Sequence, residues 1–220
     1  MKLRTLLLCA LLFAAVPGSA DNILYSNGPT NGNTDAWGIN YLGSVSDTFI
    51  VPSGGNAISG ANFAMWLFPG DILQSAEVLI TSDKLGGGTV YFDQVLFFSQ
   101  SGCSGNQYGY NVCQETTNFS GPNLSQGTYW LDLKNARVNT GDPIYWDENS
   151  GPSSAAQCCQ PREGLSTAVG TIPSESFTVL AEFTTFGASQ TVPEPASLVT
   201  LLSGSLTVFG ALGALRRKRF

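Results

Sequence analysis

The sequence contains no histidine and carries little charge. Only 12% of its 220 residues are charged, about half the share found in an ordinary soluble domain. Without histidine, the chain has no Ser-His-Asp triad, no Cys-His pair and no histidine-ligated zinc. The formal net charge is −6. An acidic chain lacks the basic stripe that offsets phosphate charge, so nucleic acid is not an expected partner.

The first 20 residues have the three parts of a secretory signal peptide. Lys2 and Arg4 supply positive charge, residues 6–16 form an apolar stretch too short to span a bilayer, and Ala20 is a small residue at the cleavage position. This pattern predicts that residues 1–20 are a signal peptide and that the protein is exported.

A second apolar segment lies near the C-terminus. Residues 196–215 are uncharged and mostly apolar, and a helix of 20 residues spans about 30 Å, the thickness of a bilayer core. The segment ends at a basic cluster made of Arg216, Arg217, Lys218 and Arg219. By the positive-inside rule, we expect a transmembrane helix over 196–215 and a cytoplasmic tail over 216–220.

A short proline motif precedes this segment. Its residues are Val192, Pro193, Glu194 and Pro195, at the end of a linker predicted over 189–195. The motif, the apolar segment and the basic cluster together resemble the PEP-CTERM sorting signal of Gram-negative bacteria. The resemblance implies an exosortase-type membrane processing enzyme as a partner. It also implies a membrane-anchored precursor in the envelope, removal of the tail, and a final place at the cell surface or in the extracellular polysaccharide matrix.

The region from 21 to 188 has the residue pattern of a β-domain. Apolar residues alternate with a period of two, as in Phe63, Met65 and Leu67, and turn-forming Gly, Pro, Asn and Asp separate the runs. We expect an all-β domain, an antiparallel β-sandwich, with a jelly roll as the first choice and an immunoglobulin-like sandwich as the second. The expected strands cover 23–26, 36–41, 45–51, 57–68, 73–81, 89–99, 110–119, 127–137, 143–147 and 175–185.

Two runs, 61–68 and 95–98, are apolar on both faces. They predict central strands that are covered on both sides, with a partner surface as the alternative. Residues 31–37, 66–71 and 141–149 resemble segments of the sandwich domains that PEP-CTERM proteins often carry. That resemblance implies a fold and a cellular context, and no activity.

Four cysteines remain once Cys9 leaves with the signal peptide. An even number in an exported chain favours disulfides. We expect a bridge between Cys103 and Cys113, which closes a short Gly-rich hairpin. Cys158 and Cys159 then form a vicinal bridge or stay free. In the alternative pairing, each of them joins one of the first two cysteines.

Acidic residues gather near the end of the predicted strand 143–147. Asp142, Asp147 and Glu148 supply oxygen ligands of the kind that calcium prefers, and calcium is the one cofactor that the sequence suggests. The alternative is that Asp142 begins a turn and the others are solvated loop residues.

Aromatic rings beside amides are the second candidate site. Exposed Trp and Tyr rings stack on sugars, so Trp146, Tyr108, Tyr110 and Asn149 are candidate ligand contacts. The alternative is that these rings belong to the core.

No catalytic residues are predicted. Asp147 and Glu148 are adjacent, so on a strand they face opposite ways and cannot flank one bond. We therefore expect an exported, non-catalytic surface or matrix protein. The alternatives are a carbohydrate-binding module and, third, a secreted glycan-cleaving enzyme. Residues 21–192 hold fifteen Asp and Glu against four Lys and Arg, which favours cations and neutral glycans as ligands.

Overall fold

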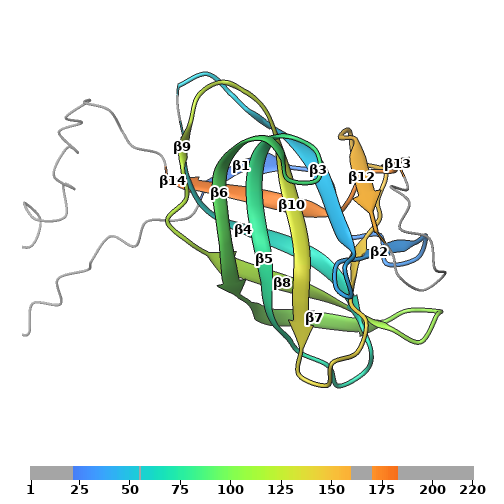
Figure 1. The fold of residues 1–220 in the computed structure, drawn as a ribbon. Coiled ribbons are helices and arrows are strands. Elements are labelled where there is room, and N and C mark those ends of the chain that lie inside the picture. The colour runs from blue at the N-terminus through green and yellow to red at the C-terminus, as the bar shows by residue number, and fades with distance from the viewer. Residues whose placement is uncertain (1–21, 55, 160–169, 183–220) are drawn as a thin grey trace, which may run out of the picture. The chain divides into compact units, whose positions relative to one another are not determined.

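The computed structural model describes residues 22–54, 56–159 and 170–182, all within Met1–Thr184, the first of two compact units. These residues form strands joined by turns and loops, and none of them lies in a helix. The strands make two antiparallel sheets (Figure 1). Within the described ranges there is accordingly no helix that could cross a membrane.

The first sheet has six strands in the order β13-β12-β3-β10-β5-β6. Its long members are the hairpin of β5 and β6 with β10 and β3 beside it, and β6 is a terminal strand of the sheet. The strands are β3 (Ser44–Val51), β5 (Leu73–Asp83), β6 (Gly87–Phe97), β10 (Gly127–Val138), β12 (Ala155–Cys158) and β13 (Gly170–Ile172).

The second sheet has eight strands arranged around β4 (Asn56–Leu67). On one side of β4 lie β14 and β11, end to end, with β1 and β2 as their outer neighbours. On the other side lie β8 and β9, and β7 pairs with β8. The bounds are β1 (Asn22–Ser26), β2 (Ala36–Gly38), β7 (Ser99–Gly105), β8 (Asn111–Asn118), β9 (Asn123–Leu124), β11 (Tyr145–Asp147) and β14 (Phe177–Glu182).

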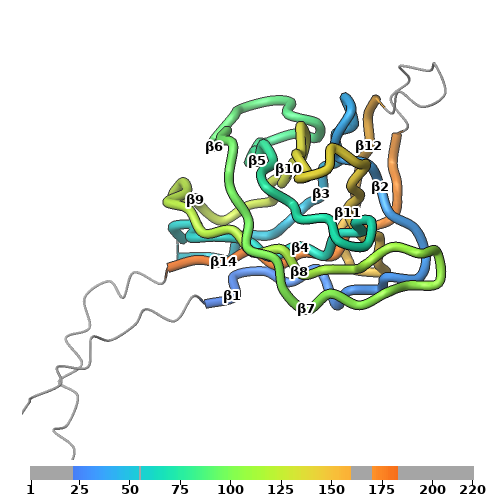
Figure 2. The backbone as a smooth tube through the Cα atoms, turned by 90° about the horizontal axis from the view of Figure 1, so that it is seen from below, coloured from blue at the N-terminus to red at the C-terminus, as the bar shows by residue number. Residues whose placement is uncertain are grey.

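The core lies between the two sheets. Figure 2 shows β5, β6 and β10 in one layer and β4, β8 and β14 in the other. Alternate residues of these strands point inward, and side chains such as Phe49, Phe63 and Leu131 are fully buried. Each fully buried side chain of this size stabilises the fold by about 1.5–3 kcal/mol relative to exposure. The alternation of apolar residues in the sequence therefore predicts correctly which face of each strand lies in the core.

The structure confirms an all-β, antiparallel, sandwich-like domain and adds four strands. Every expected strand range contains an observed strand, with ends that differ by a few residues. The sequence did not predict β7, β9, β12 or β13 as separate strands. All four are short or rich in Ser, Gly, Ala and Gln, so they lack an apolar alternation.

The prediction of two central strands is right for 61–68 and wrong for 95–98. Residues 61–67 belong to β4, which is paired on both sides. Residues 95–97 belong to the terminal strand β6, where Val95 and Phe97 are exposed. The predicted signal peptide 1–20, the motif 192–195, the predicted transmembrane segment 196–215 and the predicted tail 216–220 lie outside the described residues.

Candidate functional site

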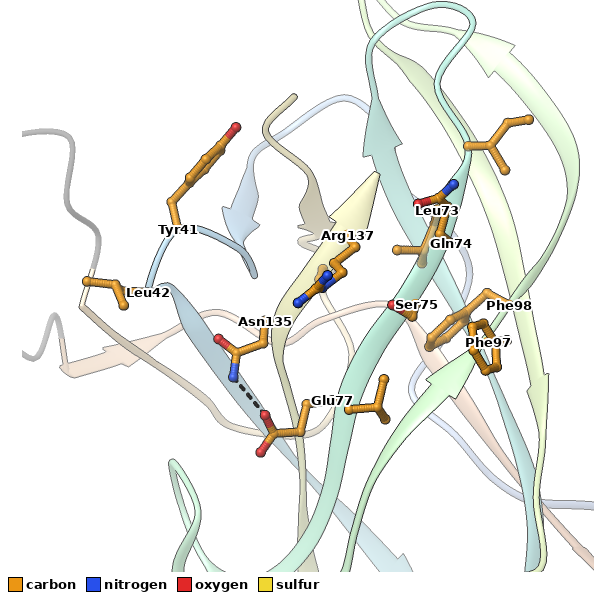
Figure 3. A pocket seen from close by; sticks show the side chains of 13 residues that line it. Tyr41, Leu42, Leu73, Gln74, Ser75, Glu77, Phe97, Phe98, Asn135 and Arg137 are labelled. Atoms are coloured by element: carbon orange, nitrogen blue, oxygen red, sulfur yellow. Dashed lines mark hydrogen bonds between the residues drawn. The ribbon is translucent and has the colours of Figure 1, made fainter. Parts of the chain in front are cut away.

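A groove of about 1110 Å³ opens on the six-stranded sheet (Figure 3). Its lining comes from β10, β5 and β6 and from the turn between β2 and β3. Five large hydrophobic side chains that line it are exposed: Tyr41, Leu42, Ile72, Val95 and Phe97. Phe97 has the highest exposed fraction of these, 79%. The gathering of exposed apolar side chains in one groove makes it the candidate site of the domain.

One row of three residues crosses the groove from strand to strand. Arg137 of β10 pairs with Ser75 of β5, and Ser75 pairs in turn with Phe97 of β6. Side chains at paired positions stand on the same face of a sheet. The small, buried Ser75 lies between the two large ones, as Figure 3 shows. The row therefore forms a notch between a guanidinium and a phenyl group, and the strands that carry them, β10 and β6, lie roughly 10 Å apart at two strand spacings.

A bulge in β10 shapes the middle of the groove. The pairing with β5 shifts between Lys134 and Arg137, and Asn135 has a positive φ of 50°. Asparagine tolerates this left-handed conformation better than most residues. The bulge exposes Asn135, whose Nδ2 donates a hydrogen bond of 2.7 Å to Glu77.

Glu77 is the one carboxylate among the described residues that line the groove, and its partners hold it in its ionised form. Burial alone would raise its pKa, but the hydrogen bonds from Asn135 and Lys134 and the charge of Lys134 outweigh burial and lower the pKa. The Lys134 Nζ lies 2.9 Å from the Glu77 carboxylate. Among the described residues, no ion pair engages Arg137. The groove thus presents a carboxylate acceptor, an amide and a guanidinium that has no ion-pair partner among the described residues.

Tyr41 forms a second ring at the groove. Tyr41 and Leu42 both have positive φ in the tight turn that ends where the Gly43 N–H donates to the Asn40 carbonyl. The Tyr41 hydroxyl donates to the Gly141 carbonyl, which fixes the ring while leaving 53% of the residue exposed. Sequence reasoning missed this groove. The run 95–98, apolar on both faces, was the signal that could have indicated it.

Trp146, a candidate ligand contact, is fully buried in the core. Its ring packs edge-on against Phe63 and Phe177, and its Nε1 donates to the Ser176 carbonyl. Asn149 is also buried, and its Nδ2 donates to the Asn27 carbonyl. Both residues therefore hold the fold together, and neither presents a surface to a ligand.

Tyr108 and Tyr110 lie at the β7–β8 hairpin. Tyr108 stacks on Trp66 with the ring centroids 5.6 Å apart, and Tyr110 packs against Trp66 and Phe68. The Tyr108 hydroxyl donates to the Asn33 carbonyl, and the residue is 54% exposed. The structure thus brings the two tyrosines together, apart from Trp146 and from the groove. Their contact with a ligand stays a prediction.

Asp142, Asp147 and Glu148 are used in three different ways. Asp142 is exposed, and its backbone carbonyl accepts from Asn40. The Asp147 carboxylate is buried and accepts from the backbone N–H groups of Asn31 and Gly32 and from Trp66 Nε1. Glu148 accepts from Trp37 Nε1. In the described part of the chain, no group of three or more acidic or Cys residues is arranged to hold a metal ion.

A pair of glutamates is buried where β11 and the segment before β14 meet. Glu148 and Glu175 form an isolated antiparallel bridge, flanked by hydrogen bonds from Asn149 N to Ser174 O and from Ser176 N to Asp147 O. Both side chains therefore face the same way. Neither Glu175 oxygen has a hydrogen-bond partner among the described residues. Burial, followed by the charge of Asp47 and then of Glu148, raises the pKa of Glu175 well above its ordinary value.

The four cysteines of the domain form the two neighbouring pairs. Cys103 and Cys113 are bridged, with a Cα–Cα distance of 4.1 Å, and the bridge links β7 to β8. Cys158 and Cys159 are joined as a vicinal disulfide at the end of β12. The structure thus confirms the expected bridge between Cys103 and Cys113. It does not have the alternative pairing, in which Cys158 and Cys159 are each joined to one of these two cysteines.

No protein-family model matches the chain, and no curated protein matches it.

Proposed function

We propose that this is an exported, non-catalytic protein of the cell surface or extracellular matrix, sorted by a C-terminal PEP-CTERM signal. The observation that carries the proposal is the order of three elements: the motif Val192–Pro195, the apolar segment 196–215 and the basic cluster 216–219. Two prolines hold the motif in an extended form that a processing enzyme can bind outside the membrane. The disulfides suit export, because such bonds persist in oxidising compartments.

We assign the sandwich to the jelly-roll class, on the strength of its strand order. Eight strands are divided between the sheets as two interlocked Greek keys require: β1, β3, β4, β5, β6, β8, β10 and β14. In one sheet the spatial order is β1-β14-β4-β8, and in the other it is β3-β10-β5-β6. An immunoglobulin-like sandwich would place consecutive strands differently.

The proposal of a non-catalytic role is supported by the arrangement of carboxylates among the described residues. In the groove, Glu77 is paired with Lys134, and the side chain of Asp93 is hydrogen-bonded to Glu77, so these two carboxyl groups lie in direct contact. The buried pair Glu148 and Glu175 is 8% and 0% exposed, too little for a substrate to reach. A glycan-cleaving enzyme needs two carboxylates about 5–10 Å apart in an open cleft, and neither site provides them.

Fractionation of the producing cells tests the sorting proposal. We expect the native protein in the extracellular fraction. A variant with Pro193→Ala and Pro195→Ala should stay in the membrane fraction, because the extended motif is lost. The matched control Ser197→Ala changes a neighbouring residue and should be released like the native protein. Equal release of the proline variant would refute sorting through this motif.

The second candidate function is carbohydrate binding, and the exposed groove of the six-stranded sheet favours it. Exposed rings at Tyr41 and Phe97 flank polar Asn135 and Arg137. This combination suits sugars, which have apolar ring faces and hydroxyls at their edges. Binding to the extracellular polysaccharide would give a matrix protein its place outside the cell.

A further inference from the structure

We propose that the notch formed by Arg137, Ser75 and Phe97 is the binding site for a neutral oligosaccharide. The proposal rests on the second candidate function and names its site and ligand class. A pyranose ring stacks on Phe97 above Ser75, and its hydroxyls bond to Arg137 and to the Glu77–Asn135 pair of the next row.

The shape of the notch suits a flat ring. Phe97 is 79% exposed, so its phenyl face is open to a ligand. Ser75, which lies between Arg137 and Phe97, is the smallest of the three side chains and lines the groove. The strands that carry Arg137 and Phe97 lie roughly 10 Å apart, so a sugar ring against the phenyl group turns its edge toward the guanidinium. Because β6 is the terminal strand of the sheet, a longer chain can leave over its edge.

The polar groups match the chemistry of sugar hydroxyls. Each hydroxyl donates one hydrogen bond and accepts others. Arg137 offers only donors, ionised Glu77 only acceptors, and Asn135 both. Hydrogen bonds to charged groups are stronger than those between neutral groups. A purely apolar partner would leave these groups desolvated and unpaired.

The size of the groove points to more than one sugar unit. Its volume of about 1110 Å³ exceeds the range of roughly 300–1,000 Å³ that is usual for small-ligand pockets. Tyr41 supplies a second exposed ring on the far side of Arg137. The two rings therefore serve as platforms for different units of one oligosaccharide.

Charge selects a neutral glycan over an acidic one. The described residues include thirteen Asp and Glu against three Lys and Arg. One of these three, Lys134, is already paired with Glu77. An anionic polysaccharide would meet an acidic domain around the groove, and like charges placed together disfavour binding.

Isothermal titration of the purified protein tests the site. The probes are cellohexaose, mannohexaose and maltohexaose as neutral glycans, and oligogalacturonate as the acidic one. We expect at least one neutral probe to bind. Phe97→Ala and Arg137→Ala should each weaken that binding about tenfold or more, since each removes a central contact. Ser75→Phe should abolish binding by filling the notch.

Val90→Ala is the matched control. Val90 is an exposed apolar residue of the same strand β6 and does not line the groove. Its affinity should equal that of the native protein. Thermal unfolding of each variant checks that the fold is retained, which the exposure of Phe97 and Arg137 leads us to expect.

Different failures have different meanings. Binding that Phe97→Ala and Arg137→Ala leave unchanged would refute this site while glycan binding itself stands, and loss of binding in Tyr108→Ala would move the site to the β7–β8 hairpin. Binding of oligogalacturonate alone would refute the neutral class. A dimer that Phe97→Ala dissociates would make the groove an interface between copies. No binding to any probe would remove both the site and the second candidate function, and would leave the sorting proposal intact.

Discussion

Glu115 is a buried acid whose replacement should stabilise the protein at neutral and alkaline pH. It lies on β8, paired with Phe63 of β4 and Gln100 of β7, and it is fully buried. Neither of its carboxylate oxygens has a hydrogen-bond partner among the described residues. Burial raises its pKa from 4.5 to about 8. The folded protein therefore keeps Glu115 protonated well above the pH at which the unfolded chain ionises it.

The size and sign of the effect follow from these two pKa values. Because the folded state binds the proton more tightly, the free energy of unfolding falls as pH rises from about 4.5 to about 8. A pKa difference of about 3.5 lowers the free energy of unfolding by about 5 kcal/mol at high pH. At pH 7 it lowers this free energy by about 3 kcal/mol. Gln has the shape of protonated Glu and does not titrate. Near pH 4, Glu115→Gln should have the same free energy of unfolding as the native protein. At pH 7 and at high pH, its free energy of unfolding should be larger by these amounts.

Urea unfolding at several pH values measures the difference. The exposed Glu182→Gln, on β14, is the matched control, and its difference from the native protein should stay within about 0.5 kcal/mol throughout. A Glu115→Gln difference that is flat between pH 4 and pH 8 would refute the reasoning, because it would mean that the carboxylate is solvated or paired in the folded state.

Three further predictions concern the core and the disulfides. Glu175→Gln should also stabilise the protein as pH rises, by up to about 1.4 kcal/mol per pH unit, since it removes a buried acid with a raised pKa; urea titrations that show no gain would contradict this. Trp146→Ala should destabilise by about 3–5 kcal/mol in the same assay, as loss of a fully buried ring requires, and a loss below 1 kcal/mol would place the ring outside the core. Replacing Cys103 and Cys113 together by Ser should lower the free energy of unfolding by roughly 3 kcal/mol, which is the loop-closure entropy for a sequence separation of 10 residues. An unchanged urea midpoint would show that the bridge does not constrain the unfolded chain.

Local patterns predicted the strands because alternation is a property of a single segment. Residues 61–67 and 177–182 alternate or are apolar throughout, and both became strands whose inward residues are buried. Pairing between distant strands leaves no such local trace. The run 95–98 looked central, yet the chain crosses from β6 to β7 in the other sheet, so β6 remains terminal and Phe97 is exposed.

The same limit applies to the sites. Glu148 and Glu175 are 27 positions apart, and only the meeting of β11 with the segment before β14 brings them face to face. Trp146 lies beside two acidic residues in the sequence, which suggested a ligand site. In the structure the alternation along β11 turns its ring into the core. The Cys103–Cys113 bridge could be predicted because a hairpin brings neighbouring segments together by itself.

The mass of the released protein tests the central proposal most directly. We predict that intact-mass spectrometry of the extracellular form shows a chain that begins after Ala20 and has lost residues 196–220. A released form that still carries Arg216–Phe220 would contradict sorting by a processed C-terminal signal.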